Sequence, residues 1–345
     1  MKFQRLGPLR VLVLASGCIK VAAMTSRLVV VSGGNRGVGI GICRQVLACD
    51  ATAQVVVTAR QLDQAESVCQ ELNQKYETDD EHRAYAHALD VTDDNSCQKL
   101  VEYLESQHLQ GDDKETRPLS LVNNAGVAFD LPWFPAPWPA EAARKTLEVN
   151  LLGAHRLTQA LLPLLEKSQD GRVINVSSGG GRANMKKMSE ANRNKLLDET
   201  VTWEDIQNMA TIFCQEYEQA ATIAATAAVA LAAENPQQQQ PQQPQQLPFL
   251  SPSGYWLQSY GFSKACLGSY TQIVARQFPS ILSMACSPGF IATDMSKTYP
   301  QYDTLKTVDE GGTFVANLAT ADRASLESGV FYQPETGVVS FVADG

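Results

Sequence analysis

Short apolar runs rich in β-branched residues recur along this chain, and stretches compatible with amphipathic helices separate them. A nearly continuous apolar run predicts a buried strand, whereas apolar positions three and four residues apart predict one face of a helix. Strands are predicted at residues 27–32, 54–60, 84–89, 118–122, 171–178, 280–287 and 329–332. Helices are predicted at residues 40–48, 64–76, 93–107, 140–165, 262–278 and 307–319.

This alternation predicts an α/β fold. Strands that alternate with helices form a parallel sheet with helices on both of its faces. We therefore expect a single doubly wound parallel sheet, Rossmann-like and three layers thick. In such sheets the ligand binds at the carboxyl ends of the strands, so the residues that follow each strand are the first candidates for chemistry.

Two regions interrupt the alternation. Residues 129–139 are aromatic and proline-rich, which predicts a loop that either packs over the sheet edge or lines a substrate entrance. Residues 179–256 hold a helical part at 188–217, capped by Thr202 with Asp205, and an alanine-rich helix candidate at 220–233. Residues 236–248 are nearly all Gln and Pro and are expected to be disordered.

Composition narrows the classes of partner. Apolar residues make up 44% of the 345 positions, as in a globular protein, and the net charge is −9. An acidic chain offers no broad basic surface, which argues against nucleic acid or an anionic membrane as a partner. The alanine-rich candidate is too short and too weakly apolar to span a bilayer. No glycine-lysine dipeptide or Gly-x-Ser-x-Gly elbow occurs, so a P-loop or α/β-hydrolase site is not expected.

Cysteine and histidine spacing argues against a metal site. The eight cysteines form no Cys-x-x-Cys pair and the four histidines have no ligand spacing, so neither zinc nor a disulfide framework is expected. Residues 1–26 form either an extension or a targeting segment, because Lys2, Arg5 and Arg10 precede the apolar run 11–19. Free thiols favour a cytoplasmic protein over a secreted one, with organelle targeting as the alternative.

Glycines follow the first predicted strand at once. Gly33, Gly37 and Gly39 lie between that strand and the next helix, an arrangement that lets a backbone turn approach a pyrophosphate at the helix N-terminus. An acid about 20 residues further on commonly binds the ribose 2′-hydroxyl of NAD, but Arg60 stands there and Arg36 lies in the turn. Two guanidinium groups would pair with a 2′-phosphate, so NADP(H) is predicted over NAD(H).

A phenol and an amine lie one helical turn apart at Tyr260 and Lys264. Lowering the pKa of tyrosine from about 10 into the neutral range requires roughly 4 kcal/mol. A cation ~4–5 Å away supplies energy of that order at an effective dielectric of about 20. The pair alone is common on helix surfaces, but in this setting it predicts a proton-transfer catalyst.

The motifs together resemble a known family. Ser32-Gly33 with Gly37 and Gly39, then Asn123-Asn124-Ala125-Gly126, Ser177-Ser178, Tyr-x-x-x-Lys and Ser287-Pro288-Gly289 with Thr293 recur in that order. The chain resembles the short-chain dehydrogenases/reductases, and most closely their carbonyl reductase branch, from about residue 27 to 332. The resemblance implies one NADP-binding reductase domain at 27–345, with an insertion at 179–256 like the helical segment that keeps carbonyl reductases monomeric.

The resemblance also implies roles for individual residues. Tyr260 would be the general acid/base, Lys264 would hold the nicotinamide ribose and lower the pKa of the phenol, Ser178 would bind the substrate carbonyl, and Asn150 would complete a proton relay. Tyr260 and Lys264 would thus contact the cofactor, and Ser178 and Tyr260 would contact the substrate. The other expected cofactor positions are Gly33, Asn35, Arg36, Gly37, Val38, Gly39, Arg60, Asp90, Val91, Asn123, Ala125, Gly126, Pro288, Gly289, Ile291 and Thr293. Asp90 either binds the adenine amino group or caps the helix at 93–107.

The predicted function is NADPH-dependent reduction of a ketone, aldehyde or quinone to an alcohol. The same residues could run the reverse oxidation of a secondary alcohol or steroid. A different class is a non-catalytic NADP(H)-responsive binding protein that acts through the Gln/Pro-rich tract. Gly179, Gly180 and Gly181 stand where carbonyl reductases have bulkier apolar residues, so the resemblance does not identify the substrate.

Overall fold

A computed structural model of the chain describes residues 26–76, 82–109, 117–134, 138–234, 250–334 and 336–339. The N-terminal segment up to residue 25, part of the loop at 129–139 and the Gln/Pro-rich tract lie outside this described part. No helix within the described residues is long and apolar enough to cross a membrane.

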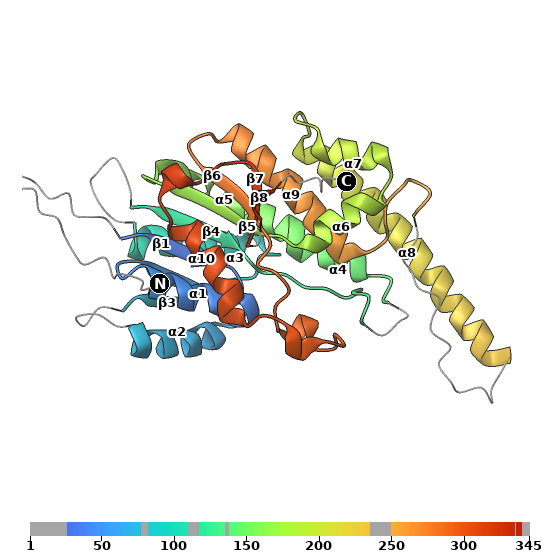
Figure 1. Cartoon of the computed structure of the whole chain (residues 1–345), viewed down its shortest axis with the longest axis horizontal. Helices are drawn as coiled ribbons and strands as arrows, with labels where there is room; N and C mark the ends of the chain where they lie inside the picture. The colour runs from blue at the N-terminus through green and yellow to red at the C-terminus, as the bar shows by residue number, and fades with distance from the viewer. Residues whose placement is uncertain are drawn as a thin grey trace, which may run out of the picture.

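One sheet runs through the molecule, with strand order β3-β2-β1-β4-β5-β6-β7-β8 (Figure 1). The strands are parallel except the last, which pairs antiparallel with β7. Their bounds are β1 Leu28–Val31, β2 Gln54–Ala59, β3 Ala84–Ala88, β4 Leu119–Asn123, β5 Gly171–Val176, β6 Leu282–Cys286, β7 Val330–Gln333 and β8 Gly337–Val339. The seven predicted strands are confirmed, and β8 is an addition.

Helices cover both faces, so the predicted three layers are confirmed. Alternate residues of β1 face opposite layers: Val29 and Val31 pack beneath one set of helices, and Leu28 and Val30 beneath the other. The first layer holds α1 Gly37–Cys49, α2 Leu62–Tyr76 and α10 Val308–Thr320. The second holds α3 Asp94–Gln107, α5 Ala154–Lys167 and α9 Ser259–Gln277.

Helix α9 begins three residues before the predicted range, so Tyr260 belongs to its first turn. The helix predicted at 140–165 is α4 Ala142–Leu147 followed by a π-helical segment, η1 Glu148–Gly153, and then α5. Asn150 lies in that π segment, and such segments frequently mark functional sites. Short 3₁₀ turns, η2 Asp294–Ser296, η3 Tyr302–Thr304 and η4 Arg323–Ser325, complete the C-terminal part.

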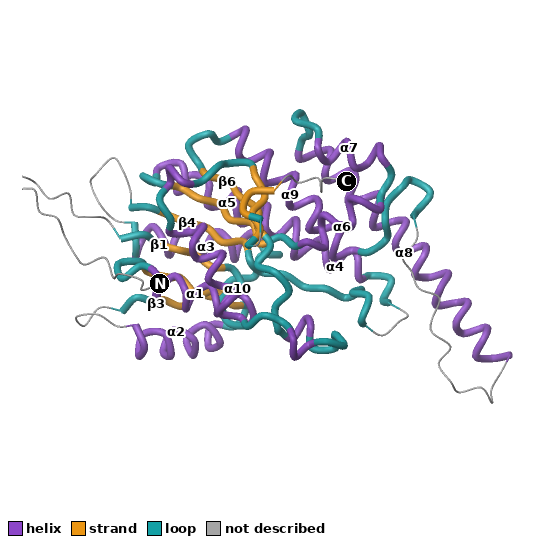
Figure 2. Tube along the Cα trace, in the orientation of Figure 1, coloured by secondary structure: helices purple, strands orange, loops and turns teal. Residues whose placement is uncertain are grey.

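The insertion is helical. It comprises α6 Gly179–Lys187, α7 Glu190–Leu197 and α8 Trp203–Glu234. The predicted cap of α8 is confirmed, because Asp205 accepts the Thr202 amide and donates its own amide to the Thr202 hydroxyl. The near half of α8 packs on α9, with the Phe213 and Phe262 rings stacked 4.0 Å apart. The far half extends away from the sheet (Figure 2).

Helix α6 was not predicted, because three consecutive glycines disfavour a helix. Contact with α9 explains it. A β-carbon at Gly181 would lie 2.8 Å from the Ala265 nitrogen, so only glycine lets the two helices approach so closely. Tertiary packing has overridden local propensity here.

Candidate active site

Four strand ends meet at one edge of the sheet. The Asn124 side chain, after β4, donates to the carbonyl groups of Ser32 and Gly33, after β1. The Gly179 amide, after β5, donates to the Ser287 hydroxyl, after β6. The fold thus brings four of the sequence motifs to the carboxyl edge, where parallel sheets bind ligands.

The glycine turn forms a close-fitting cradle. Gly33 and Gly37 have φ values of +64° and +54°, a region that favours glycine. A β-carbon at Gly39 would lie 2.1 Å from the Gly33 carbonyl oxygen. No side chain caps the N-terminus of α1, so its first amides remain open toward the turn. This is the arrangement expected of an anion site at a helix N-terminus.

The turn faces the loop after β6. The β-carbon position of Gly37 is 3.5 Å from Thr293, and the Arg36 guanidinium pairs with Asp294 at 3.1 Å. Both side chains of that pair are more than half exposed, so the pair is weak and Arg36 can exchange partners. Arg60 is also exposed, at the end of β2.

Ser178 follows β5 by two residues and is the N-cap of α6. Its hydroxyl oxygen accepts the Gly180 amide at 3.0 Å, which leaves the hydroxyl proton available to another acceptor. The β-carbon position of Gly180 lies 3.3 Å from Ser178 Oγ and 3.6 Å from the Tyr260 ring. The two side chains therefore flank one point, although they are far apart in the sequence.

The pKa of Tyr260 differs from the sequence expectation. Burial raises the pKa of this phenol, and a hydrogen bond with Ser178 offsets part of the rise. The expected lowering by Lys264 is absent because Lys264 Nζ lies 5.7 Å from the ring centre and donates to the Val176 carbonyl oxygen at 2.7 Å. Burial also lowers the pKa of Lys264 to about 8. Tyr260 thus keeps its proton at neutral pH.

Asn150 connects the site to its surroundings. Its side chain exchanges two hydrogen bonds with the Val127 backbone and donates to Ser263 Oγ, which in turn donates to the Tyr260 carbonyl. Gly126 separates Asn150 from Lys264, because its β-carbon position is 3.4 Å from Asn150 Oδ1 and 3.7 Å from Lys264 Nζ. The four predicted catalytic residues therefore lie in one neighbourhood.

Two of the candidate cofactor residues, Asn123 and Val91, have buried side chains. The Asn123 side chain is buried in the sheet, where it donates to Thr158 and Asn175, so only its backbone remains for a ligand. Val91 is buried and packs against Gly153 of the π segment.

Asp90 does not cap α3, because Asp93 does so through the Asn95 amide. Burial opposes ionisation of Asp90, but hydrogen bonds from Thr92 and the charge of Arg60 lower its pKa. A carboxylate and a guanidinium therefore lie together beside the expected adenosine end of the site.

Two residues at this edge were given no individual role from the sequence. Asn124 ties the glycine turn to β4, and its place in the Asn-Asn-Ala-Gly motif was the available signal. Asp130 accepts the amides of Ser259 and Tyr260, and nothing in its local sequence indicates that contact.

The loop that carries Asp130 packs on the protein, as one of the two alternatives considered for it predicts. Leu131 and Trp138 are buried, whereas the Trp133 ring lies 5.4 Å from Phe290 and 5.2 Å from Tyr299, in the loop after β6. The described part of this loop thus packs against the protein and also contacts the loop after β6.

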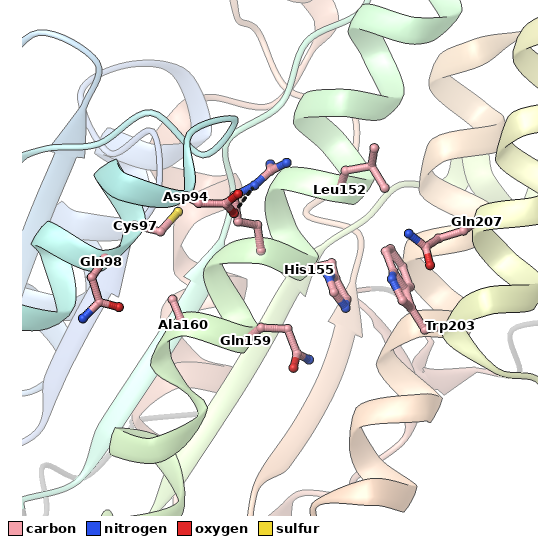
Figure 3. A pocket seen from close by; sticks show the side chains of 10 residues that line it. Asp94, Cys97, Gln98, Leu152, His155, Gln159, Ala160, Trp203 and Gln207 are labelled. Atoms are coloured by element: carbon pink, nitrogen blue, oxygen red, sulfur yellow. Dashed lines mark ion pairs between the residues drawn. The ribbon is translucent and has the colours of Figure 1, made fainter.

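A separate hollow of about 450 Å³ lies between α3, α5 and the start of α8 (Figure 3). There the His155 ring stacks on Trp203 with centroids 3.8 Å apart, and Arg156 pairs with Asp94 at 2.7 Å. None of the predicted site residues lines it. Its contacts join the insertion to the sheet-covering helices.

Comparison with known proteins agrees with this geometry. Residues 27–190 match the family described as short chain dehydrogenase. Almost half of the chain thus resembles the short-chain dehydrogenase/reductase family. The chain is similar to (+)-neomenthol dehydrogenase of Arabidopsis thaliana, with 28% identity over 90% of this chain and 97% of the relative. It is also similar to carbonyl reductase (NADPH) 3 of Mus musculus, with 28% identity over 85% of this chain and 91% of the relative.

A solved structure extends the likeness to the fold. Salutaridine reductase from Papaver somniferum is 25% identical and superposes with a TM-score of 0.66, over 89% of this chain and 99% of that one. The family match and these relatives, each named as a reductase or dehydrogenase, indicate an oxidoreductase.

Proposed function

We propose that this protein acts as a short-chain dehydrogenase/reductase that reduces a ketone, aldehyde or quinone to an alcohol with NADPH. One observation carries the proposal: Ser178 and Tyr260 converge on the same point beside Gly180, with Lys264 one turn further along α9. A carbonyl oxygen between the two hydroxyl groups would meet two donors. The curated relatives named above, a carbonyl reductase (NADPH) among them, support the reaction class.

The residues present fit a dinucleotide with a 2′-phosphate. The uncapped start of α1 and the Gly33–Gly39 cradle suit a pyrophosphate. Arg36 and Arg60 are exposed cations beside the cradle and at the end of β2, where a 2′-phosphate is expected. The loop after β6 would border the nicotinamide through Pro288, Gly289, Ile291 and Thr293.

The chemistry divides between the cofactor and the chain. Bound NADPH supplies the hydride that the carbonyl carbon accepts. Ser178 donates its free hydroxyl proton as a hydrogen bond to the carbonyl oxygen and so polarises it. Tyr260 gives its proton to that oxygen as negative charge develops, and the raised pKa of the phenol keeps the proton in place beforehand. Lys264 and Asn150 are fixed beside this pair, since Lys264 donates to the Val176 carbonyl oxygen and Asn150 bonds to the Val127 backbone.

The insertion supports a monomeric state. Helices α7 and α8 pack on α9, and Trp203 of α8 stacks on His155 of α5. The faces of α5 and α9 that these contacts cover are not available to a second subunit. A cytoplasmic location remains a prediction from the free thiols.

The proposal is tested by NADPH oxidation with a panel of ketones, aldehydes and quinones. Tyr260→Phe should reduce turnover by about 100-fold or more while NADPH still binds, as followed by nucleotide fluorescence. Full turnover of this variant would rule out the role of Tyr260. Oxidation of alcohols with NADP⁺ and no reduction at neutral pH would favour the reverse reaction, and NADPH binding without turnover of any substrate would favour a binding protein.

A further inference from the structure

Asp130 is a fully buried carboxylate that belongs to none of the predicted catalytic positions. It lies in the loop after β4, far in sequence from α9. Its two oxygens accept the backbone amides of Ser259 and Tyr260, the latter at 3.3 Å. The residue that carries the proposed general acid is therefore attached, through its own backbone, to a different part of the chain.

These bonds account for the start of α9. Gln258 accepts the Gly261 amide through its side chain, and Asp130 accepts the two amides before it. The first three amides of α9 are thus all satisfied, whereas α1 has no side-chain cap. Burial raises the pKa of Asp130, and the amides of Ser259 and Tyr260 offset part of that rise, because such partners at a helix N-terminus make a buried carboxylate tolerable.

A third element reaches the same carboxylate. Tyr217 of α8 is 1% exposed, and its hydroxyl makes no hydrogen bond of good geometry with a described residue. Burial, together with the neighbouring Asp130 carboxylate, raises the pKa of Tyr217. Asp130 therefore lies where the loop after β4, the insertion helix and the first turn of α9 meet.

We propose that Asp130 is a positioning residue for Tyr260. Helix ends fray, and Tyr260 lies in the first turn of α9, where fraying would move the phenol. Asp130 holds that turn against the loop that carries Trp133. The inference rests on the proposed function, because it gives Asp130 a purpose only if the direction of the Tyr260 phenol controls the reaction.

The test compares two Asp→Asn substitutions at helix starts. Asp130→Asn keeps the size of the side chain but replaces one acceptor with a donor that faces a backbone amide. We expect kcat to fall by about tenfold to 100-fold, with KM for substrate and NADPH affinity within about twofold, because misplacement of a reacting group by 1 Å costs about 100-fold. Asp205→Asn alters the matched cap of α8, distant from Tyr260, and should change thermal stability without changing kcat.

The outcomes separate this inference from the proposed function. If Tyr260→Phe is inactive and Asp130→Asn retains the wild-type kcat, Asp130 has no positioning role while the proposed function stands. If Tyr260→Phe is active, the proposed function itself is wrong. Should Asp130→Asn not fold, Asp130→Ser retains an acceptor without excess volume. Its kcat per NADPH-binding site must also fall, and a wild-type value would overturn the inference.

Discussion

The Lys264 ammonium donates to the carbonyl oxygen of Val176, 2.7 Å away, and so attaches the second turn of α9 to the end of β5. Because the side chain is 5% exposed, burial lowers the pKa of Lys264 to about 8. The group is charged below that pH and neutral above it. Its ionisation therefore falls within the working range of an enzyme assay.

The first prediction is that kcat/KM for reduction declines as the pH rises through about 8. Deprotonation removes a positive charge from the site, where negative charge develops on the substrate oxygen during reduction. The pH profile of NADPH oxidation measures this directly. Lys264→Arg is the control, since a guanidinium stays charged, and the decline should move above pH 10 in the activity that remains. An unmoved decline would assign it to another group.

The second prediction concerns the choice of cofactor. Arg60→Asp should lower the ratio of kcat/KM for NADPH to that for NADH by about tenfold to 100-fold, the equivalent of one charged hydrogen bond of about 1.5–3 kcal/mol. Arg144→Asp is a matched surface change in α4, where Arg144 pairs with Glu218, and should leave the ratio unchanged. An unchanged ratio in Arg60→Asp would count against 2′-phosphate recognition by this residue.

Much of this site was predictable because its signals are local. A glycine turn after an apolar run, paired asparagines, paired serines and Tyr-x-x-x-Lys each lie within a few residues, and strand ends of a parallel sheet must share an edge. The alternation of strands and helices was enough to predict that Gly33, Asn124, Ser178 and Pro288 lie at one edge of the sheet.

The features that were missed depend on contacts between distant segments. Gly181 belongs to a helix because α9 lies against it, and the π segment at Asn150 has no local pattern of its own. The pKa of Tyr260 was predicted in the wrong direction because it depends on burial and on the hydrogen bond that draws Lys264 toward Val176. Asp130 reaches α9 only after the chain has folded.

The third prediction uses the opening beside Ser178. A β-carbon at Gly179 would meet nothing within 4 Å among the described residues, so Gly179→Ile should fold with no loss of stability. Its added bulk lies next to Ser178 and should lower kcat/KM for a polycyclic ketone at least tenfold more than for a small aldehyde. Gly181→Ala is the control for a steric clash with α9, and it should lower the midpoint temperature of thermal unfolding. Equal losses for both substrates would show that Gly179 does not border the substrate.

The fourth prediction concerns a structural carboxylate. Asp170 pairs with Arg27, Arg172 and Arg323, of which Arg172 is 1% exposed. Although burial opposes ionisation, hydrogen bonds and the charges of these arginines hold the pKa of Asp170 well below its usual range. Its contribution to stability is thus present above the usual aspartate pKa of about 3.9 and is lost as the pH falls below it.

Asp170→Asn should therefore lower the free energy of unfolding at pH 7 by about 3–5 kcal/mol, the cost of leaving a buried charge without its partner. The difference from wild type should narrow as the pH is lowered from 4 toward 2, because Asp170 binds a proton there in the unfolded wild type but keeps its charge in the folded protein. Urea unfolding followed by circular dichroism measures both effects. Glu141→Gln breaks an exposed pair with Lys145 and should cost far less than Asp170→Asn, because water screens that pair. A similar small loss in Asp170→Asn would show that backbone carbonyls such as those of Leu318 and Ala321 suffice to hold Arg172.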